Sequence, residues 1–213
     1  DVNDLPFSLV VAGPTGGGTT VLLKMPDVHE ALDMTNEQLH DLDDALRVIS
    51  WERRELFQNL VAGKVFEEPV DKATLRQLLD IFNSQCEKSL AEQILTSKQQ
   101  RRLNQLLLQL QGVAAFQREN VADSLNLTLA QQDAVTSICD SARHARRTLG
   151  EANSETLPLL SGAQRSRWQA MQGEPFAFAY LCQQTETAQE KQRITQFANT
   201  KSRSQLKETA LSR

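Results

Sequence analysis

The chain has 213 residues, of which 40% are hydrophobic and only 5% aromatic, and its formal net charge is -4. The mild negative charge excludes a general nucleic-acid binder, and no apolar run approaches the roughly 20 residues that a membrane-spanning helix needs. The length is sufficient for one sizeable core or two small ones. Stretches rich in Leu, Gln, Glu and Arg favour helices over sheet, so the sequence predicts an all-α fold.

Residues 1–23 are predicted to form an extended, Gly-rich segment. A short apolar run at 7–12 precedes a Gly/Thr-rich stretch that begins at Gly13. An apolar strand followed by G-x-x-x-x-G and Thr is similar to a phosphate-binding loop, but Thr19 stands where that loop needs Lys. Pro26 also interrupts the helix that should follow. A linker is therefore the preferred interpretation.

Four segments share the pattern apolar-Thr/Ser-x-x-Gln, and each precedes a helical apolar pattern. The Thr or Ser is expected to be the N-cap, whose hydroxyl accepts from the backbone N–H three residues on, while the Gln side chain reaches back to the N–H of the cap. The preceding Leu or Met can pack on the first turn. The motif residues are Met34, Thr35, Gln38, Leu95, Thr96, Gln99, Leu127, Thr128, Gln131, Leu160, Ser161 and Gln164.

Residues 24–112 are predicted to form a long antiparallel helical hairpin. Pro26 is a favourable first helical residue. After the first box, apolar residues recur at spacings of three, four and seven up to Leu60, as in a coiled-coil seam. Gly63 is predicted to end this helix. A second seam follows over residues 75–94, and the second box then opens the last helix of the unit.

Residues 113–173 repeat this plan as a shorter hairpin. Val28–Gln38 aligns without gaps on Val121–Gln131, and Leu95–Arg102 aligns on Leu160–Arg167. The boxes lie 61 positions apart in the first unit (35 to 96) and 33 apart in the second (128 to 161). Each arm of the second hairpin is therefore predicted to be about 14 residues, or roughly 20 Å, shorter.

Residues 174–213 are predicted to contain a docking segment and a polar tail. Phe176, Phe178 and Tyr180 alternate with small residues, which favours an extended segment that docks across the helices. From Gln183 the chain has few large apolar residues, so a mobile tail or a solvated helix is expected.

No residue pattern predicts catalysis, a cofactor or a specific metal site. Cys86, Cys139 and Cys182 match no zinc or redox spacing and are interpreted as buried hydrophobes, with one disulfide left open if the protein is exported. His29 and His40 have acidic neighbours but form no H-x-x-x-H pair, so metal sensing is the weaker alternative. Hydrolase and oxidoreductase signatures are also missing, and we predict that the protein is not an enzyme.

The repeated box around an antiparallel hairpin resembles the LTxxQ family of bacterial envelope proteins, the Spy/CpxP group. Two boxes match the family motif in full, whereas Met34 replaces Leu in the first and Ser161 replaces Thr in the last. The resemblance covers about residues 24–173 and looks like a tandem of two family units. It implies a small all-helical periplasmic protein that forms dimers and acts as an ATP-independent chaperone or an envelope-stress regulator.

The resemblance also implies what the protein binds. Unfolded or partner polypeptides, or a second copy of the chain, would be held on an apolar, concave face that carries cations. The same arginines would equally fit solvated helix faces. The alternative function is a structural or scaffolding module whose seams pair with a partner or with themselves, without chaperone activity. The candidate client-binding residues are Arg101, Arg102, Arg143, Arg146, Arg147, Arg165 and Arg167.

The expected location is the periplasm or another extracytoplasmic compartment. The numbering begins at Asp1 rather than at Met. On the family resemblance, we expect that a signal peptide has been removed.

Overall fold

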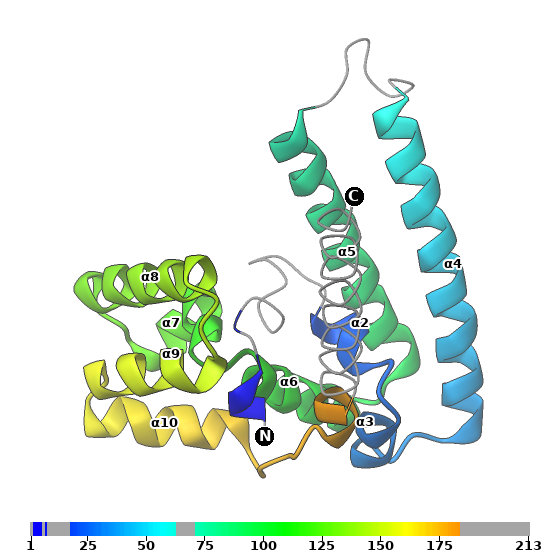
Figure 1. Ribbon diagram of the computed structural model, residues 1–213. Coiled ribbons are helices and arrows are strands. Elements are labelled where there is room, and N and C mark those ends of the chain that lie inside the picture. The colour runs from blue at the N-terminus through cyan, green and yellow to red at the C-terminus, as the bar shows by residue number, and fades with distance from the viewer. Residues whose placement is uncertain (1, 6, 8–17, 63–70, 184–213) are drawn as a thin grey trace, which may run out of the picture.

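The computed structural model describes residues 2–5, 7, 18–62 and 71–183 of the chain (Figure 1). Of the described residues 82% are helical and none lies in a β-strand, which confirms the predicted all-α class. No described helix is both long and apolar enough to cross a membrane. The predictions for the Gly-rich run at 13–17, for Gly63 and for the tail from residue 184 onward lie outside the described residues.

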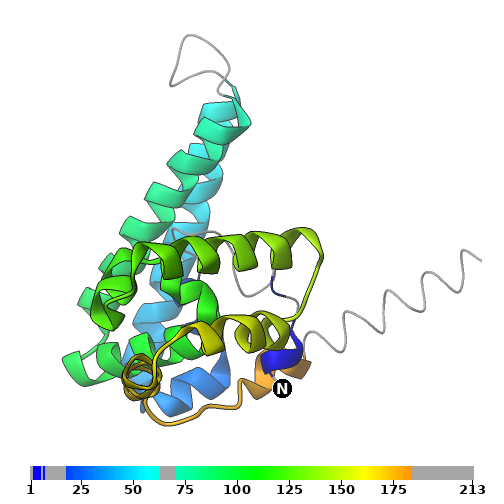
Figure 2. The ribbon, with the colours of Figure 1, turned by 90° about the vertical axis from the view of Figure 1, so that its left-hand side faces the viewer.

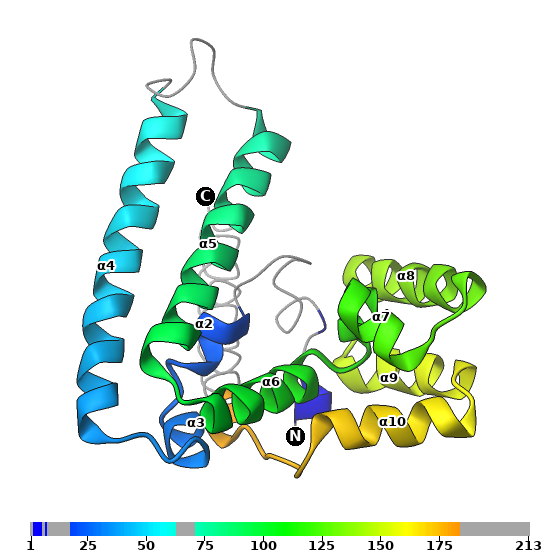
Figure 3. The same ribbon diagram turned by 180° about the vertical axis from the view of Figure 1, so that it is seen from behind.

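The first unit consists of two long helices that stand on two shorter ones. α4 (Asn36–Val61) and α5 (Lys72–Ile94) lie side by side, run in opposite directions and pack chiefly against each other (Figures 1 and 3). We call this pair the arm, and Figure 2 shows it projecting from the other described helices. The shorter helices are α3 (Pro26–Ala31) and α6 (Ser97–Gln111).

The boundaries of these helices have local causes. Pro26 lies in the first turn of α3, where its missing N–H has no intrahelical partner to lose. Asp71 is the N-cap of α5, and its carboxylate accepts from the N–H groups of Ala73 and Thr74, which lower its pKa. α6 ends at Gly112, whose φ of 52° and ψ of -136° are accessible almost only to glycine.

The second unit has the same order of elements on a smaller scale. α8 has 16 residues against 26 in α4, and α9 has 8 against 23 in α5. The shortening is therefore unequal, 10 residues in one helix and 15 in the other. The elements are η2 (Gly112–Gln117), α7 (Glu119–Leu125), α8 (Leu129–His144), α9 (Leu149–Thr156), η3 (Leu157–Leu159) and α10 (Gly162–Gln172).

The N-terminal residues depart from the predicted linker because they pack on both units. η1 (Val2–Asp4) lies on α9, and α2 (Gly18–Leu22) lies on α6. η1 can approach α9 closely because Gly150 has no side chain. A Cβ at this position would lie only 3.0 Å from the carbonyl oxygen of Asn3. The described part of residues 1–23 is therefore part of the folded body.

Two short backbone contacts fix this N-terminal segment to the second unit. Phe7 N–H donates to the carbonyl of Arg147 at 2.8 Å, and Leu149 N–H donates to the carbonyl of Leu5 at 3.0 Å. The side chains of Leu5 and Phe7 are buried, as are Leu22 and Leu23 further on. Because a Gly-rich stretch separates these apolar residues, the sequence pattern indicated a linker and did not predict that they are buried.

One contiguous apolar core joins the two units. At their junction η2 contributes five consecutive buried residues, Gly112–Phe116. Phe116 is 1% exposed and meets Trp168 of α10 edge to face, with ring centroids 4.7 Å apart and an interplanar angle of 81°. The connection between the units is thus part of the core.

Residues 174–178 have no regular secondary structure and dock on α6, as the alternating pattern predicted. Gln109 holds them, since its Nε2 donates to the carbonyls of Gln172 at 2.7 Å and Glu174 at 2.8 Å, while its Oε1 accepts from Phe176 N–H at 2.8 Å. Phe178 is fully buried and stacks edge to face on Phe176. This segment is therefore fixed to α6 by both hydrogen bonds and apolar packing.

Candidate functional site

All four predicted boxes form helix N-caps in the structure. In each one the Thr or Ser hydroxyl accepts from the backbone N–H of the Gln three residues on, and that Gln side chain accepts from the N–H of the cap. Two otherwise unsatisfied donors are thereby bonded at each helix start. The caps are Thr35 of α4, Thr96 of α6, Thr128 of α8 and Ser161 of α10.

The first two boxes also bind each other through their glutamines. Gln38 Nε2 donates to Gln99 Oε1 at 2.9 Å, and Gln99 Nε2 donates back to Gln38 Oε1 at 3.0 Å. The second N–H of each amide reaches a carbonyl: that of Ile94 at 2.7 Å from Gln38, and that of Asp33 at 3.3 Å from Gln99. We call this cyclic arrangement an amide clasp, and it joins the starts of α4 and α6.

The third and fourth boxes form a second amide clasp with the same connections. Gln131 and Gln164 exchange hydrogen bonds of 3.0 and 3.1 Å. Their remaining N–H groups donate to the carbonyls of Leu159 at 2.8 Å and Asn126 at 3.2 Å. In all four cases the carbonyl belongs to the residue two positions before the partner box's cap. The sequence repeat is therefore also a repeat of hydrogen bonds.

The clasp explains why the third residue after each cap is Gln. Within a clasp each amide oxygen accepts from its own cap N–H and from the partner amide, and each amide nitrogen donates twice. The oxygens of Gln99 and Gln131 also accept from the hydroxyl of their own cap. These bonds use both amide donors and the acceptor capacity of the side chain. A Glu carboxylate would supply no donor, and Glu at both positions would place two negative charges against each other. The motif therefore joins helix starts as well as capping them.

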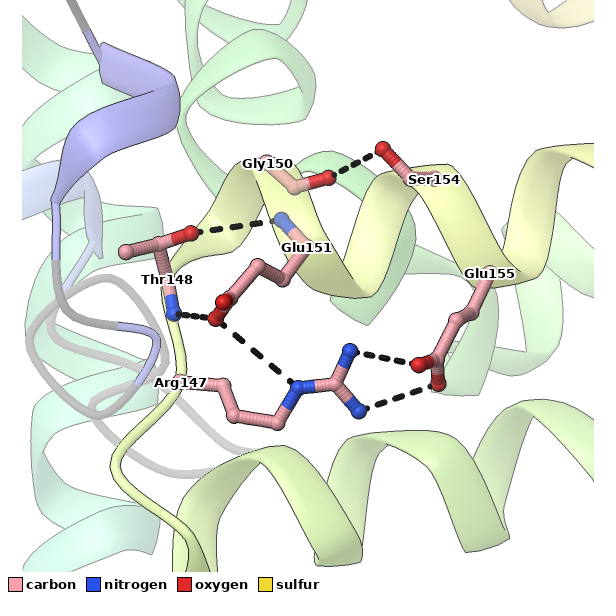
Figure 4. A network of polar contacts seen from close by, with 6 residues as sticks. All are labelled: Arg147, Thr148, Gly150, Glu151, Ser154 and Glu155. Carbon is pink, nitrogen blue, oxygen red and sulfur yellow. Dashed lines mark hydrogen bonds and ion pairs between the residues drawn. The ribbon is translucent and has the colours of Figure 1, made fainter.

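A fifth capping box, which the sequence interpretation missed, supports this reasoning. Thr148 and Glu151 cap α9, but this box joins no clasp, and its third residue is Glu (Figure 4). Its charge is used instead by Arg147, whose Nε lies 3.8 Å from Glu151 and whose terminal nitrogens bind Glu155 at 3.0 and 2.5 Å. The T-x-x-E spacing was a sufficient signal to find it.

Backbone conformation repeats beside the clasps as well. Asp33 and Asn126 occupy equivalent positions two residues before a cap, and both have left-handed φ angles, 52° and 50°. At the other end of each unit, Gly112 and Gly173 both end a helix with positive φ. These matched positions show that the two units share a backbone plan at their base.

The structure uses four of the seven candidate arginines within the fold. Arg102 donates to the carbonyl of Glu174 at 2.9 Å, and Arg167, at the equivalent position of the second unit, donates to the carbonyl of Ser124 at 2.8 Å. Arg143 binds Asp140 and Gln117, and Arg147 binds Glu155 as described above. The three that are exposed and make no polar contact with another described residue are Arg101, Arg146 and Arg165.

Four of the eight large apolar side chains that are exposed among the described residues lie on the arm, and the other four are Val21, Leu129, Leu159 and Tyr180. Among the described residues, Val48, Trp51 and Phe57 of α4 are 54%, 63% and 46% exposed, and Ile81 of α5 is 47% exposed. Because α4 packs chiefly against α5, no third helix layer covers the three residues of α4 in the described structure, whereas Ile81 of α5 lines a groove shared with α2 and α6. The seam pattern predicted the residues through which α4 and α5 face each other. It did not predict these additional exposed apolar residues.

A shallow groove of about 370 Å³ runs between the two helices of the arm. We call it the arm groove. Its described lining is largely apolar and consists of Ala45, Val48, Ile49, Glu52, Phe82, Gln85, Cys86, Ser89, Leu90 and Gln93.

A larger groove of about 990 Å³ lies where α2, α5 and α6 meet. Its described lining combines apolar residues such as Ile81, Leu103 and Leu107 with charged ones, Glu87, Lys88 and Arg118. Glu87 accepts from the N–H and hydroxyl of Thr20, and burial lowers the pKa of the Arg118 guanidinium. The arm groove differs from this larger groove in that Glu52 is the single charged residue in its described lining.

The cysteines and histidines form no visible reactive centre. Cys86, Cys139 and Cys182 are unpaired, and burial raises the pKa of the Cys139 thiol to about 11. His29 and His144 each contact a backbone carbonyl. Within the described ranges no three His, Cys, Asp or Glu side chains are grouped so that they could hold a metal ion.

Comparison with models of known protein families, with curated proteins and with solved structures found no match to this chain.

Proposed function

We propose that the protein binds unfolded or partner polypeptides without ATP, as an extracytoplasmic chaperone or envelope-stress binding protein. The observation that carries the proposal is the set of exposed apolar side chains on the arm, beside an apolar groove. Exposed apolar side chains next to an apolar groove are typical of an interaction site. Unfolded chains expose apolar side chains that such a surface can cover.

The arm supports weak, repeated contacts rather than one tight pocket. Trp51 and Val48 lie on α4 one helical turn apart, and the groove beside Val48 is shallow. Covering apolar surface contributes roughly 25 cal/mol per Å², so each side chain adds only a modest part of the binding free energy. A client held by several such contacts can be released without hydrolysis of ATP.

Membership of the Spy/CpxP-like group and a periplasmic location are parts of this proposal. They are supported by the boxes at Thr35, Thr96, Thr128 and Ser161, two of which match the family motif in full. The repeated clasp favours a tandem of two units, because each pair of boxes forms one complete structural joint. A fold alone does not establish an activity, so the test is functional.

The test is suppression of the aggregation of a chemically denatured client by the purified protein in the absence of ATP. We expect suppression near equimolar protein, and the variants Trp51→Ser and Phe57→Ser should require several-fold more protein. Leu129→Ser is the matched control, because Leu129 is a highly exposed apolar residue of α8, outside the arm. No suppression by the wild-type protein at large excess would remove the chaperone proposal.

A scaffolding module is the second candidate, favoured by the half-buried seam residues Leu46, Ile49 and Leu56 of α4. In that case the arm would be covered by a second copy or a partner. Light scattering at several protein concentrations distinguishes the two functions. A stable dimer that Trp51→Ser dissociates, together with no client protection, would favour the scaffold.

A further inference from the structure

We propose that the arm groove selects apolar polypeptide segments that carry lysine or arginine, rather than acidic ones. The inference rests on the proposed function, because it names the class of client that the arm binds. It reverses the charge preference expected from the arginines of the sequence interpretation.

The first observation is the position of carboxylates around the apolar centre of the groove. Val48 lines the groove, and four acidic residues occur on the same side of α4 at seven and four residues before it and four and seven after it. In a helix these spacings place side chains on one face. The four are Asp41, Asp44, Glu52 and Glu55.

Most of this negative charge is not neutralised by the fold. Asp44 pairs with Arg47 and His40. Asp41, Glu52 and Glu55 are exposed and make no ion pair with another described residue. The whole of α4 contains six carboxylates and three arginines, so the helix has a net negative charge. A cation brought to the groove would meet the carboxylate of Glu52, which lines it, while Asp41 and Glu55 lie about two helical turns to either side of Val48.

The Cys86 thiol, which lines the arm groove, is influenced by the same negative charge. Burial raises the pKa of the Cys86 thiol, and the nearby carboxylates of Glu52 and Glu87 raise it further. Glu52 of α4 therefore acts across the groove on a residue of α5. An anionic client segment would be repelled at this place, and a cationic one would be attracted.

The occupant that fits is a polypeptide segment with a bulky apolar residue beside Lys or Arg. The apolar side chain would cover Val48, Ile49 and Phe82. The aliphatic stem of Lys or Arg can lie along apolar surface while its charged end reaches Glu52 at the groove edge. Apolar contact would supply most of the affinity, and the charges would set which segments are chosen.

The seven candidate arginines do not compensate for this charge at the arm groove. None of the seven candidate arginines lines it, and those in α6, α8 and α10 belong to the base and the second unit. Acidic clients, if bound, would therefore need a different surface.

The experiment uses fluorescence of the full-length protein. The chain has two tryptophans, the exposed Trp51 on the arm and the buried Trp168 in the core, so a ligand on the arm changes the emission of Trp51. The probes are two peptides without Trp or Tyr, with Leu and Phe at the same positions, separated by Lys in one and by Glu in the other. We expect the Lys peptide to bind about 10-fold more tightly, and the difference to shrink with salt.

Charge reversal at the groove locates the effect. In Glu52→Lys the preference for the Lys peptide should fall by about 10-fold, whereas Glu174→Lys, at an exposed position outside the arm, should leave it unchanged. Equal binding of the two peptides, or tighter binding of the Glu peptide, would overturn the charge inference while leaving polypeptide binding intact. Binding of neither peptide, with emission of Trp51 unchanged, would instead count against the proposed function itself.

Discussion

The two units of this protein share a base and differ in what stands on it. At the base both have an amide clasp, a left-handed residue before the first box and a final Gly with positive φ. Above it, α4 and α5 extend for 26 and 23 residues and expose large apolar side chains, whereas α8 and α9 have 16 and 8 residues. The comparison separates a common framework from a variable arm.

The difference indicates where function resides. A joint whose polar groups are all paired offers little to a ligand, because binding would have to replace hydrogen bonds already made. The arm of the first unit lacks a further helix layer in the described structure and can offer apolar surface at little cost to the fold. Substitutions should therefore affect stability at the base and binding on the arm.

The largest expected contrast is between an aromatic residue of the core and one of the arm. Phe116→Ala should lower the free energy of unfolding by about 3–5 kcal/mol, because Phe116 is buried against Trp168. Trp51→Ala should change it by no more than about 0.5 kcal/mol. Urea unfolding followed by circular dichroism measures both. A large loss for Trp51→Ala would mean that the arm is buried in solution, as in a dimer.

The next contrast tests the amide clasp through two opposite, nearly isosteric changes. Gln99→Glu removes two N–H donors from a buried side chain and should destabilise the protein by about 2–4 kcal/mol. Glu151→Gln, in the box that joins no clasp, should cost less than about 1 kcal/mol. The measurement is urea unfolding at neutral and acidic pH.

The pH dependence makes this test specific. The new carboxyl of Gln99→Glu, buried beside carbonyl oxygens, should have a raised pKa in the folded state. Its destabilisation should therefore be smallest in acid and grow as the pH rises. A loss that is the same at both pH values would point to packing rather than to the clasp.

Much of the framework could be predicted from the sequence because its causes are local. A cap depends on residues three positions apart, so the boxes at Thr35, Thr96, Thr128 and Ser161 could be recognised directly. The pairing of Gln38 with Gln99 could not, because it joins residues 61 positions apart. The packing of the N-terminal segment could not be predicted for the same reason: Phe7 is buried, and its N–H bonds to the carbonyl of the distant Arg147.

The candidate site was harder to predict than the fold. Arg102 and Arg167 were chosen for their charge, but the structure uses them to bind carbonyls of segments far along the chain. Trp51 and Val48 lie outside the apolar seam of α4, where a sequence pattern predicts solvent exposure. Their value as a binding surface depends on whether another helix covers them, and no described helix does. The sequence shows which residues are charged, but only the tertiary structure shows which groups they bind.

A smaller contrast compares the glycines that end α6 and α10. Both have positive φ with ψ near the extended region, which other residues adopt at a cost of roughly 1–3 kcal/mol. A Cβ at Gly112 would lie 2.8 Å from Leu149 Cδ1, which is buried and cannot move away. At Gly173 it would meet the flexible side chain of Gln105.

Gly112→Ala should therefore lower the unfolding midpoint more than Gly173→Ala does. Gly162→Ala is the control, because a Cβ there meets nothing within 4 Å and φ is not positive. It should leave the stability within about 0.5 kcal/mol of wild type. Equal effects at Gly112 and Gly173 would show that backbone strain alone decides the cost and that the neighbouring side chains contribute little.

The smallest effect is expected at the turn between α8 and α9, where residues 145–148 connect the short helices (Figure 4). Arg147 holds the pKa of Glu155 below its usual range, chiefly through their hydrogen bonds. A lowered pKa in the folded state means that the pair stabilises the protein above the usual Glu range, and that this contribution is lost as the pH falls through the lowered pKa. Glu155→Gln should therefore shift the urea midpoint slightly at neutral pH, less in high salt, and hardly at all once wild-type Glu155 is protonated. A shift that persists in strong acid would show that Glu155 supports the turn through contacts other than its charge.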